Sequence, residues 1–159
     1  MPKLIAKNGF SLIEVLIFVT IVTAFFVVAV GLTSQSLQQM KSSENRLIAG
    51  YLSQEVLEWL RGEKETNWSG QFLPRAPSTT PTTYCFNTSP INTAWPGAGA
   101  CGSFNLQNTF KREVLLTRQA ITSPIQPGQS QVNVTIRMTW QEGGRTQTAI
   151  QRTIFNALE

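Results

Sequence analysis

Few side chains in this sequence are equipped for chemistry. The 159 residues include no His, and all nine acidic residues are Glu, so the chain also has no Asp. These two residue types supply the commonest general base, the commonest transition-metal ligand and much of the usual calcium-binding loop. Nucleophile pairs of the Ser-His or Cys-His kind are also excluded. The composition therefore predicts a protein that is not an enzyme and that holds no metal or other cofactor.

The two cysteines, Cys85 and Cys101, have fifteen residues between them, in a stretch rich in Pro, Gly, Thr and Asn. If this stretch lies outside the cytoplasm, the oxidising environment favours a disulfide. Closing a loop of this size stabilises a fold by roughly 3 kcal/mol in the chain-entropy model. The alternative is a pair of free, buried thiols.

One carboxylate, that of Glu14, stands inside a long apolar run. Residues 10–32 contain no other charged side chain, and as a helix they would extend about 35 Å, enough to cross a bilayer core. A charged side chain at the centre of a membrane helix costs about 2.5–3.5 kcal/mol on insertion scales. Two interpretations of Glu14 remain open: it snorkels to the membrane surface, or it has a partner within the membrane.

The residues before the apolar run indicate its orientation. They include Lys3 and Lys7 and no acidic residue, which leaves a short N-terminus in the cytoplasm and sends the remaining chain across the membrane. We therefore expect a single-pass protein of the cytoplasmic (inner) membrane with its C-terminal part outside the cytoplasm. The run is too long for an ordinary signal peptide, and the Ala-Val-Gly sequence at 29–31 is a poor cleavage site, so cleaved secretion is a minor alternative.

An amphipathic helical pattern continues beyond the apolar run. Apolar side chains recur there at three- and four-residue spacing, with polar residues between them. Because no proline occurs between Pro2 and Pro74, we expect one helix from about residue 10 to about residue 65, whose apolar stripe must be covered by other elements. The stripe consists of Leu37, Met40, Leu47, Ile48, Tyr51, Leu52, Val56, Trp59 and Leu60.

The C-terminal third of the chain is strand-like. Residues 132–140 alternate apolar and polar side chains, the pattern of a strand with one buried face. A Glu-Gly-Gly-Arg turn at 142–145 and a return strand over Thr146–Phe155 complete a hairpin. Phe110–Ile121 is a third candidate strand. Its proposed buried face comprises Phe110, Val114, Leu116 and Ala120.

The fold class expected from these elements is α+β, with the long helix packed on a small antiparallel sheet of three or four strands. Residues 66–109 contain five of the eight prolines and are expected to form a long loop. Its aromatic residues are expected to pin it to the core: Trp68, Phe72, Tyr84, Phe86 and Trp95. The expected segments are a leader (1–9), a membrane-spanning helix (10–32), its amphipathic continuation (33–65) and an extracytoplasmic loop and sheet (66–159) that form one globular unit with the amphipathic helix.

A short basic leader ends at Gly9, and Phe10 and Glu14 then stand at the head of the apolar run, in the sequence Gly-Phe-Ser-Leu-Ile-Glu-Val. This arrangement resembles the N-terminal cleavage and methylation motif of type IV pilins and type II secretion pseudopilins. The resemblance implies a type IV pilin-like fold, and a prepilin peptidase that cuts between Gly9 and Phe10 and methylates the new amino group. It also implies that Glu14 faces the positive N-terminus of a neighbouring subunit in a filament. A buried carboxylate is tolerable in that setting because it is paired.

A weaker resemblance covers residues 45–61, which are similar to the helix of minor pilins of the type IV pilus modification class and of a minor pseudopilin class. This chain departs from that pattern at Gly50 and Ser53. Glu58 and Arg61, three residues apart, are interpreted as an ion pair on the helix surface, although a contact with a partner is the alternative. The partners implied by the resemblance are the peptidase and methyltransferase, a major pilin, other minor pilins or pseudopilins, an inner-membrane assembly platform and membrane lipid.

Three functions follow as hypotheses. The first is a structural minor pilin or pseudopilin that is assembled through its N-terminal helix into a type IV pilus or a type II secretion filament. The second is a DNA-uptake or adhesion module displayed on a pilus, suggested by Arg137, Arg145 and Arg152 near Trp140. However, the formal net charge of +4 falls to +2 without residues 1–9, which is too small to predict nucleic-acid binding by itself. The third is a bitopic membrane protein unrelated to pili.

Overall fold

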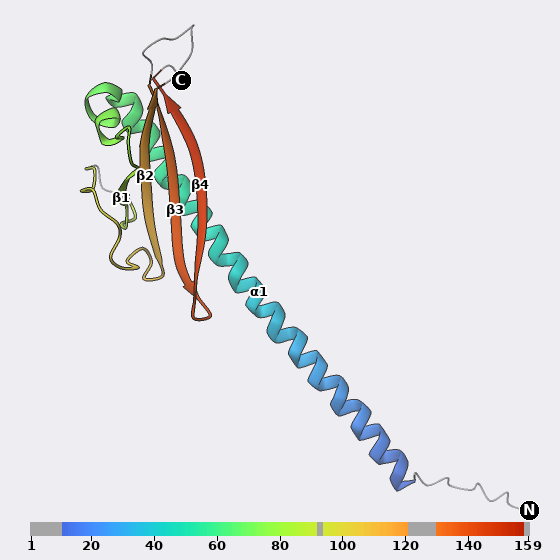
Figure 1. The fold of residues 1–159 in the computed structure, drawn as a ribbon. Coiled ribbons are helices and arrows are strands. Elements are labelled where there is room, and N and C mark those ends of the chain that lie inside the picture. The colour runs from blue at the N-terminus through green and yellow to red at the C-terminus, as the bar shows by residue number, and fades with distance from the viewer. Residues whose placement is uncertain (1–10, 92–93, 121–129, 158–159) are drawn as a thin grey trace, which may run out of the picture. The chain divides into compact units, whose positions relative to one another are not determined.

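A computed structural model of the chain describes residues 11–91, 94–120 and 130–157. Its helical elements are α1 (Leu12–Thr66) and two short turns, η1 (Trp68–Phe72) and η2 (Leu73–Arg75), and its strands are β1 (Thr82–Cys85), β2 (Phe110–Ala120), β3 (Ser130–Glu142) and β4 (Arg145–Asn156) (Figure 1). The α+β layout expected from the sequence is confirmed. The chain divides within α1 into two compact units, Met1–Ser43 and Glu44–Glu159.

The first unit contains the N-terminal part of α1, whose apolar side chains are exposed. The helix is long and apolar enough to span a membrane, with a mean hydropathy of 2.9 over 18 residues. Its threonine hydroxyl groups are satisfied within the helix: Thr20 donates to the Ile17 carbonyl at 2.8 Å, Thr23 to the Val19 carbonyl at 2.9 Å and Thr33 to the Ala29 carbonyl at 2.9 Å. Internal hydrogen bonds of this kind let polar side chains enter hydrocarbon without an unmet donor.

The second unit contains one antiparallel sheet with the strand order β1-β2-β3-β4 (Figure 1). The expected strands on either side of the Gly-Gly turn are confirmed as β3 and β4, which pair along their whole length without a bulge. Gly143 and Gly144 have φ values of 57° and 76°. Positive φ at both central residues is what a type I′ two-residue hairpin requires, and glycine adopts it without steric cost.

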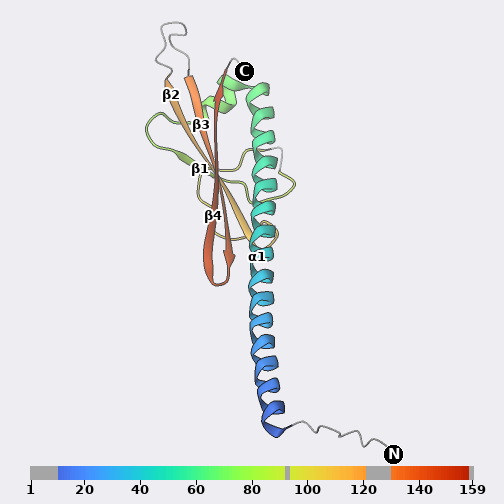
Figure 2. The ribbon, with the colours of Figure 1, turned by 90° about the vertical axis from the view of Figure 1, so that its right-hand side faces the viewer.

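Residues 44–66 of α1 lie along one face of this sheet (Figure 2). The helix side chains that are buried there are Asn45, Ala49, Leu52, Ser53, Val56, Leu57, Leu60 and Lys64. On β3, the five apolar residues that alternate from Val132 to Trp140 are all buried, as their spacing predicts. On β2, Phe110, Val114 and Leu116 are buried, but Ala120, at the end of the strand, is exposed.

The apolar stripe predicted for the helix is only partly correct. Leu52, Val56 and Leu60 are buried, whereas Leu47 and Tyr51 are 76% and 71% exposed. A helix turns through about 100° per residue, so Leu47 and Tyr51 lie on the side away from the buried residues. The spacing of apolar residues therefore assigned side chains from two different faces of the helix to one stripe, because both faces carry apolar side chains.

The segment expected to be a loop contains η1, η2 and the short strand β1. The prediction that its aromatic side chains pin it to the core is confirmed. Phe72, Tyr84 and Phe86 are buried, while Trp68 and Trp95 pack against the same hydrophobic cluster. A four-residue strand is too short to show alternation in the sequence, which is why β1 was not predicted.

Candidate functional site

The processing residues predicted from the sequence, Gly9 and Phe10, lie outside the described residues. Glu14 lies in the first turn of α1, where its backbone N–H donates to the Ser11 carbonyl at 3.0 Å and its side chain is exposed. Among the residues that the structure describes, none forms an ion pair or a side-chain hydrogen bond with Glu14. A carboxylate in the first turn interacts favourably with the helix dipole. This interaction leaves the carboxylate oxygens accessible to another molecule.

The two cysteines form the disulfide that the sequence predicts, with 5.0 Å between the Cα atoms of Cys85 and Cys101. The alternative of two free thiols was wrong. Cys85 ends β1, and the Cys101 N–H donates to a carboxylate oxygen of Glu113 on β2 at 2.9 Å. The same carboxylate lies 3.5 Å from the Arg137 guanidinium on β3. The disulfide and Glu113 therefore fasten the segment between the two cysteines to the middle of the sheet.

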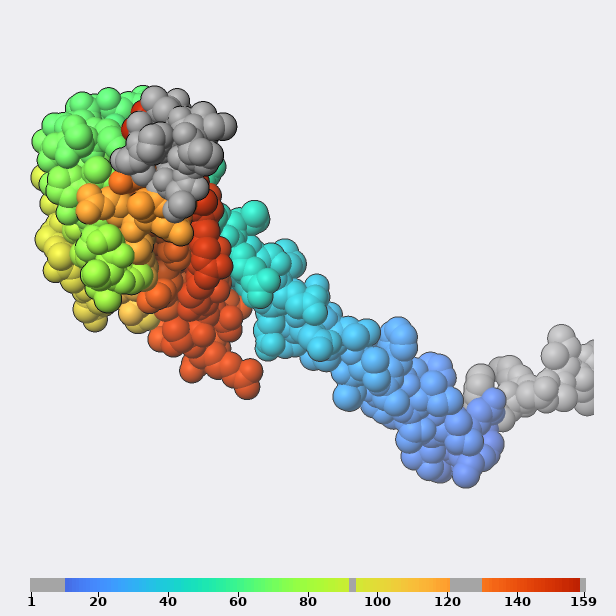
Figure 3. Space-filling view, turned by 45° about the horizontal axis from the view of Figure 1, so that its top comes forward, coloured from blue at the N-terminus to red at the C-terminus, as the bar shows by residue number. Residues whose placement is uncertain are grey.

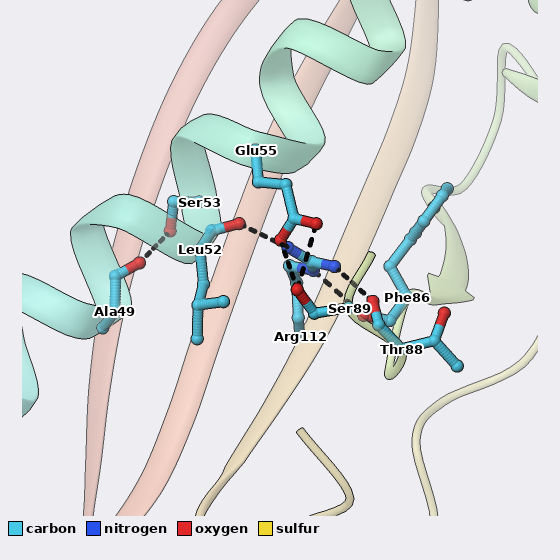
Figure 4. Close-up of polar contacts among 8 residues, drawn as sticks. All are labelled: Ala49, Leu52, Ser53, Glu55, Phe86, Thr88, Ser89 and Arg112. Atoms are coloured by element: carbon cyan, nitrogen blue, oxygen red, sulfur yellow. Dashed lines mark hydrogen bonds and ion pairs between the residues drawn. The ribbon is translucent and has the colours of Figure 1, made fainter. Parts of the chain in front are cut away.

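The most connected polar group in the second unit is the side chain of Arg112, which is fully buried on the helix-facing side of β2 (Figure 4). Its Nε donates to the Phe86 carbonyl at 2.9 Å, and its Nη2 donates to the Thr88 carbonyl at 2.8 Å. Its Nη1 donates to the Leu52 carbonyl of α1 at 2.6 Å and to the Glu55 carboxylate at 2.8 Å. One guanidinium therefore joins the helix, the sheet and the segment that follows β1.

Burial lowers the pKa of the Arg112 guanidinium, and the hydrogen bond and charge of Glu55 oppose that shift. A guanidinium remains protonated in proteins, so Arg112 is a permanent buried cation. Glu55 is the matching anion, and it also accepts a hydrogen bond from the Ser89 hydroxyl at 3.1 Å. Breaking a buried pair of this kind by removing one member is far more costly than the net stability that the intact pair contributes.

The importance of Arg112 was not predicted from the sequence. The signal was present, because Arg112 occupies the inward-facing position between Phe110 and Val114 in the period-two pattern of β2. A charged residue at a core position requires a partner, yet that partner, Glu55, is 57 residues away in the sequence. Only the packing of α1 on the sheet brings the two side chains together.

An aromatic cluster lies beside this network. The Trp95 ring is 5.0 Å from the Trp59 ring and 5.9 Å from the Phe86 ring, and its indole N–H donates to a Glu63 carboxylate oxygen at 2.6 Å. The Arg75 guanidinium lies 4.7 Å from the same indole ring. The ring of Trp95 is engaged on several sides, so it serves to hold the segment onto the helix.

The basic and aromatic cluster suggested on the terminal hairpin does not form. Trp140 is 2% exposed and packs against Phe110 on the side of the sheet that faces α1. Arg137 and Arg152 lie on the opposite face, because they pair in register with Ile150 and Thr135 rather than with the inward-facing residues. Arg145 is exposed beside the turn and pairs in register with Glu142, so the three arginines do not share one face. In contrast, the ion pair predicted on the helix surface is present, with 2.6 Å between Arg61 and Glu58.

Within the described ranges, no group of three or more Cys or Glu side chains could hold a metal ion. The features that distinguish the chain are therefore an exposed apolar helix with Glu14 in its first turn and a globular unit held together by Arg112 and a disulfide. Comparison of the chain with protein-family models, curated proteins and solved structures gave no match.

Proposed function

We propose that this protein is a structural subunit of a filament, a minor pilin of a type IV pilus or a pseudopilin of a type II secretion system. The observation that carries the proposal is Glu14, an exposed carboxylate in the first turn of a helix whose apolar side chains are also exposed. The sequence from Gly9 to Val15, which resembles a prepilin processing motif, supports the same function. In this proposal the protein acts by assembly, and its fold is a variant of the pilin fold.

Processing creates the partner of Glu14. A prepilin peptidase cuts after Gly9, and the new amino group of Phe10 is methylated. A chain that ends at Phe10 carries a positive charge in the membrane, where an unpaired charge is costly. The carboxylate of Glu14 in a neighbouring subunit neutralises that charge when the helices pack together. Until it is assembled, the protein is held in the cytoplasmic membrane with its second unit outside the cytoplasm.

The apolar surface of α1 supports assembly through helix packing. Phe18, Phe25 and Val27 are 66%, 70% and 74% exposed. In the membrane these side chains are covered by lipid, and in a filament they are covered by the helices of other subunits. In the second unit, Leu47 and Tyr51 remain exposed on the side of the helix away from the sheet, where a neighbouring subunit can cover them.

Processing and assembly are tested separately in cells that contain the peptidase and the filament machinery. Mass spectrometry of the wild-type protein should show an N-terminus at methylated Phe10, whereas Gly9→Val should retain the leader. Glu14→Gln should be inserted and processed normally, but it should be depleted from sheared filaments. Glu65→Gln, at an exposed position on the same helix beyond the apolar run, is the matched control and should assemble like the wild type.

Two results would contradict the proposal. A wild-type chain that keeps its leader in cells with an active peptidase is a bitopic membrane protein unrelated to pili. Normal recovery of Glu14→Gln in filaments would show that the carboxylate only snorkels to the membrane surface.

A further inference from the structure

The second unit has one long, open sheet edge, which is formed by β4. The opposite edge, β1, is only four residues long, whereas β4 has twelve residues. Residues 145–156 include no proline and no lysine, and they pair with β3 without a bulge. Among the described residues, the only strand that pairs with β4 is β3, and no other backbone hydrogen bond involves it. Sheet edges are usually protected by shortness, proline, charged side chains, a bulge or a cover. Of these devices, β4 has only charged side chains, those of Arg145 and Arg152.

The turn geometry determines which backbone groups face the open edge. The pair that closes a two-residue hairpin, Glu142 and Arg145, is a hydrogen-bonded pair, and bonded and non-bonded pairs then alternate along the ladder. The N–H and C=O groups of every second residue of β4 therefore point away from β3. These residues are Thr146, Thr148, Ile150, Arg152, Ile154 and Asn156. Their side chains lie on the face of the sheet opposite α1. Figure 3 shows that β4 lies at the surface of the unit.

The side chains on this face indicate what an added strand would carry. Ile150 and Ile154 are 51% and 50% exposed, and the exposed Arg152 lies between them. Within the described residues no ion pair involves Arg152. Directly opposite and diagonal cross-strand pairs of apolar side chains and of opposite charges stabilise a sheet. The complementary strand has an acidic residue opposite Arg152 and apolar residues opposite the two isoleucines.

A second copy of this chain is a poor occupant of the same edge. Among the residues that the structure describes, the face that β4 borders carries Lys111, Arg137 and Arg152 but only one carboxylate, that of Glu113. Glu113 is already engaged with Arg137 and with the Cys101 N–H. Pairing two copies edge to edge would place two faces with the same excess of positive charge side by side, which is unfavourable.

We infer that β4 is a docking edge for an extended, acidic segment of a different protein, which adds to the sheet as a fifth strand. Backbone hydrogen bonds between alternate residues of β4 and the docked segment give the affinity. The sequence apolar-x-acidic-x-apolar of the docked segment gives the specificity, because it matches the two isoleucines and the arginine of β4. This interaction goes beyond the proposed assembly function, which depends on α1, and either one can fail without the other.

The test uses the full chain in detergent micelles and a fluorescein-labelled peptide of sequence Gly-Thr-Val-Thr-Glu-Thr-Val-Thr-Gly with blocked ends. Fluorescence anisotropy should show binding, and replacing the peptide Glu by Lys should weaken it about tenfold. Methylating the peptide nitrogens of Val, Glu and Val should abolish binding, whereas methylating the intervening Thr nitrogens should leave it intact. In an added strand, the N–H groups of alternate residues point toward β4 and those between them point away. Methylation therefore blocks pairing only when it is placed on the set that points toward β4.

Two protein variants locate the peptide on β4. Thr148→Pro removes an N–H that faces the open edge but leaves the ladder with β3 intact, so binding should weaken while the unfolding curve is unchanged. Thr148→Ser keeps the N–H and is the matched control. Arg152→Glu should reverse the preference, so that the Lys peptide binds and the Glu peptide does not.

Several results would overturn the inference. One is that neither the Glu peptide nor the Lys peptide binds. Another is that the Glu peptide binds Thr148→Pro and Thr148→Ser equally well. The third is that methylation of the Val and Glu nitrogens and methylation of the Thr nitrogens weaken binding equally. Binding of duplex DNA that is lost in Arg152→Glu, with no peptide binding, would show a nucleic-acid surface instead. Self-association in micelles that Thr148→Pro abolishes would show that a second copy occupies the edge.

Discussion

Replacing Arg112 by Met should destabilise the second unit more than any other single change to a polar residue in it. Arg112→Met keeps a long, flexible side chain but removes every donor. It removes the hydrogen bonds that the guanidinium donates to the carbonyls of Leu52, Phe86 and Thr88 and to the carboxylate of Glu55. The segment after β1 then loses its polar attachment to the helix.

The size of the effect follows from burial. Breaking a buried ion pair by removing one member costs about 3–5 kcal/mol. The Arg112 side chain is fully buried, but the Glu55 side chain is 22% exposed and can turn toward water. The loss should therefore lie near the lower limit, about 3 kcal/mol of unfolding free energy.

Urea unfolding of the full chain in micelles measures this loss through tryptophan fluorescence, because all four tryptophans lie in the second unit. Arg112→Lys is the matched control: it keeps the charge but lacks the planar fork, so it should be destabilised by less than Arg112→Met. In the double variant Arg112→Met/Glu55→Met the orphaned carboxylate is gone, so its cost should be smaller than the sum of the two single costs. A loss below about 1 kcal/mol for Arg112→Met, the value of one ordinary hydrogen bond, would refute the reasoning.

Three further predictions concern the same unit. Replacing Cys85 and Cys101 by Ser should lower the unfolding free energy by about 3 kcal/mol, and adding a reductant should lower the unfolding free energy of the wild type by the same amount. A smaller loss would mean that the disulfide does little to restrict the unfolded chain. Burial raises the pKa of Tyr84 above its ordinary value of 10.0, against a smaller lowering by Arg75. The unfolded state therefore loses the proton first, and unfolding free energy should fall as pH rises through about 10 in the wild type but not in Tyr84→Phe, as followed by urea titrations at increasing pH. Gly144→Val should cost about 1–2 kcal/mol because φ is 76° there, whereas Gly144→Asn should cost less, and equal thermal shifts would contradict this explanation.

The sequence was most informative for those elements whose structure depends on residues close together in the chain. An uninterrupted run without proline fixed the extent of α1 to within two residues, and strict alternation identified the buried face of β3. The Gly-Gly pair located the hairpin turn. These features depend on helical periodicity, strand periodicity and turn stereochemistry, which short stretches of sequence record directly.

Where alternation was weak, the sequence left the structure undecided. β1 has only four residues and was not predicted. β4 carries exposed isoleucines on the face opposite α1, so its own alternation is weak, and it was predicted as the partner of β3 across the Gly-Gly turn. The prediction for the helix stripe failed at Leu47 and Tyr51, because a helix that is apolar on two sides does not show which side meets the sheet.

The sequence by itself determined the apolar helix with Glu14 in its first turn, the absence of His and Asp, and the motif on which the proposed assembly function depends. Only the tertiary structure decided that Arg112 meets Glu55, that Trp140 is separated from Arg137 and Arg152, and that β4 is left as an open edge. The physical reason is the range of the interactions. Periodicity and composition are local properties, whereas ion pairs, sheet faces and sheet edges depend on which distant segments pack together.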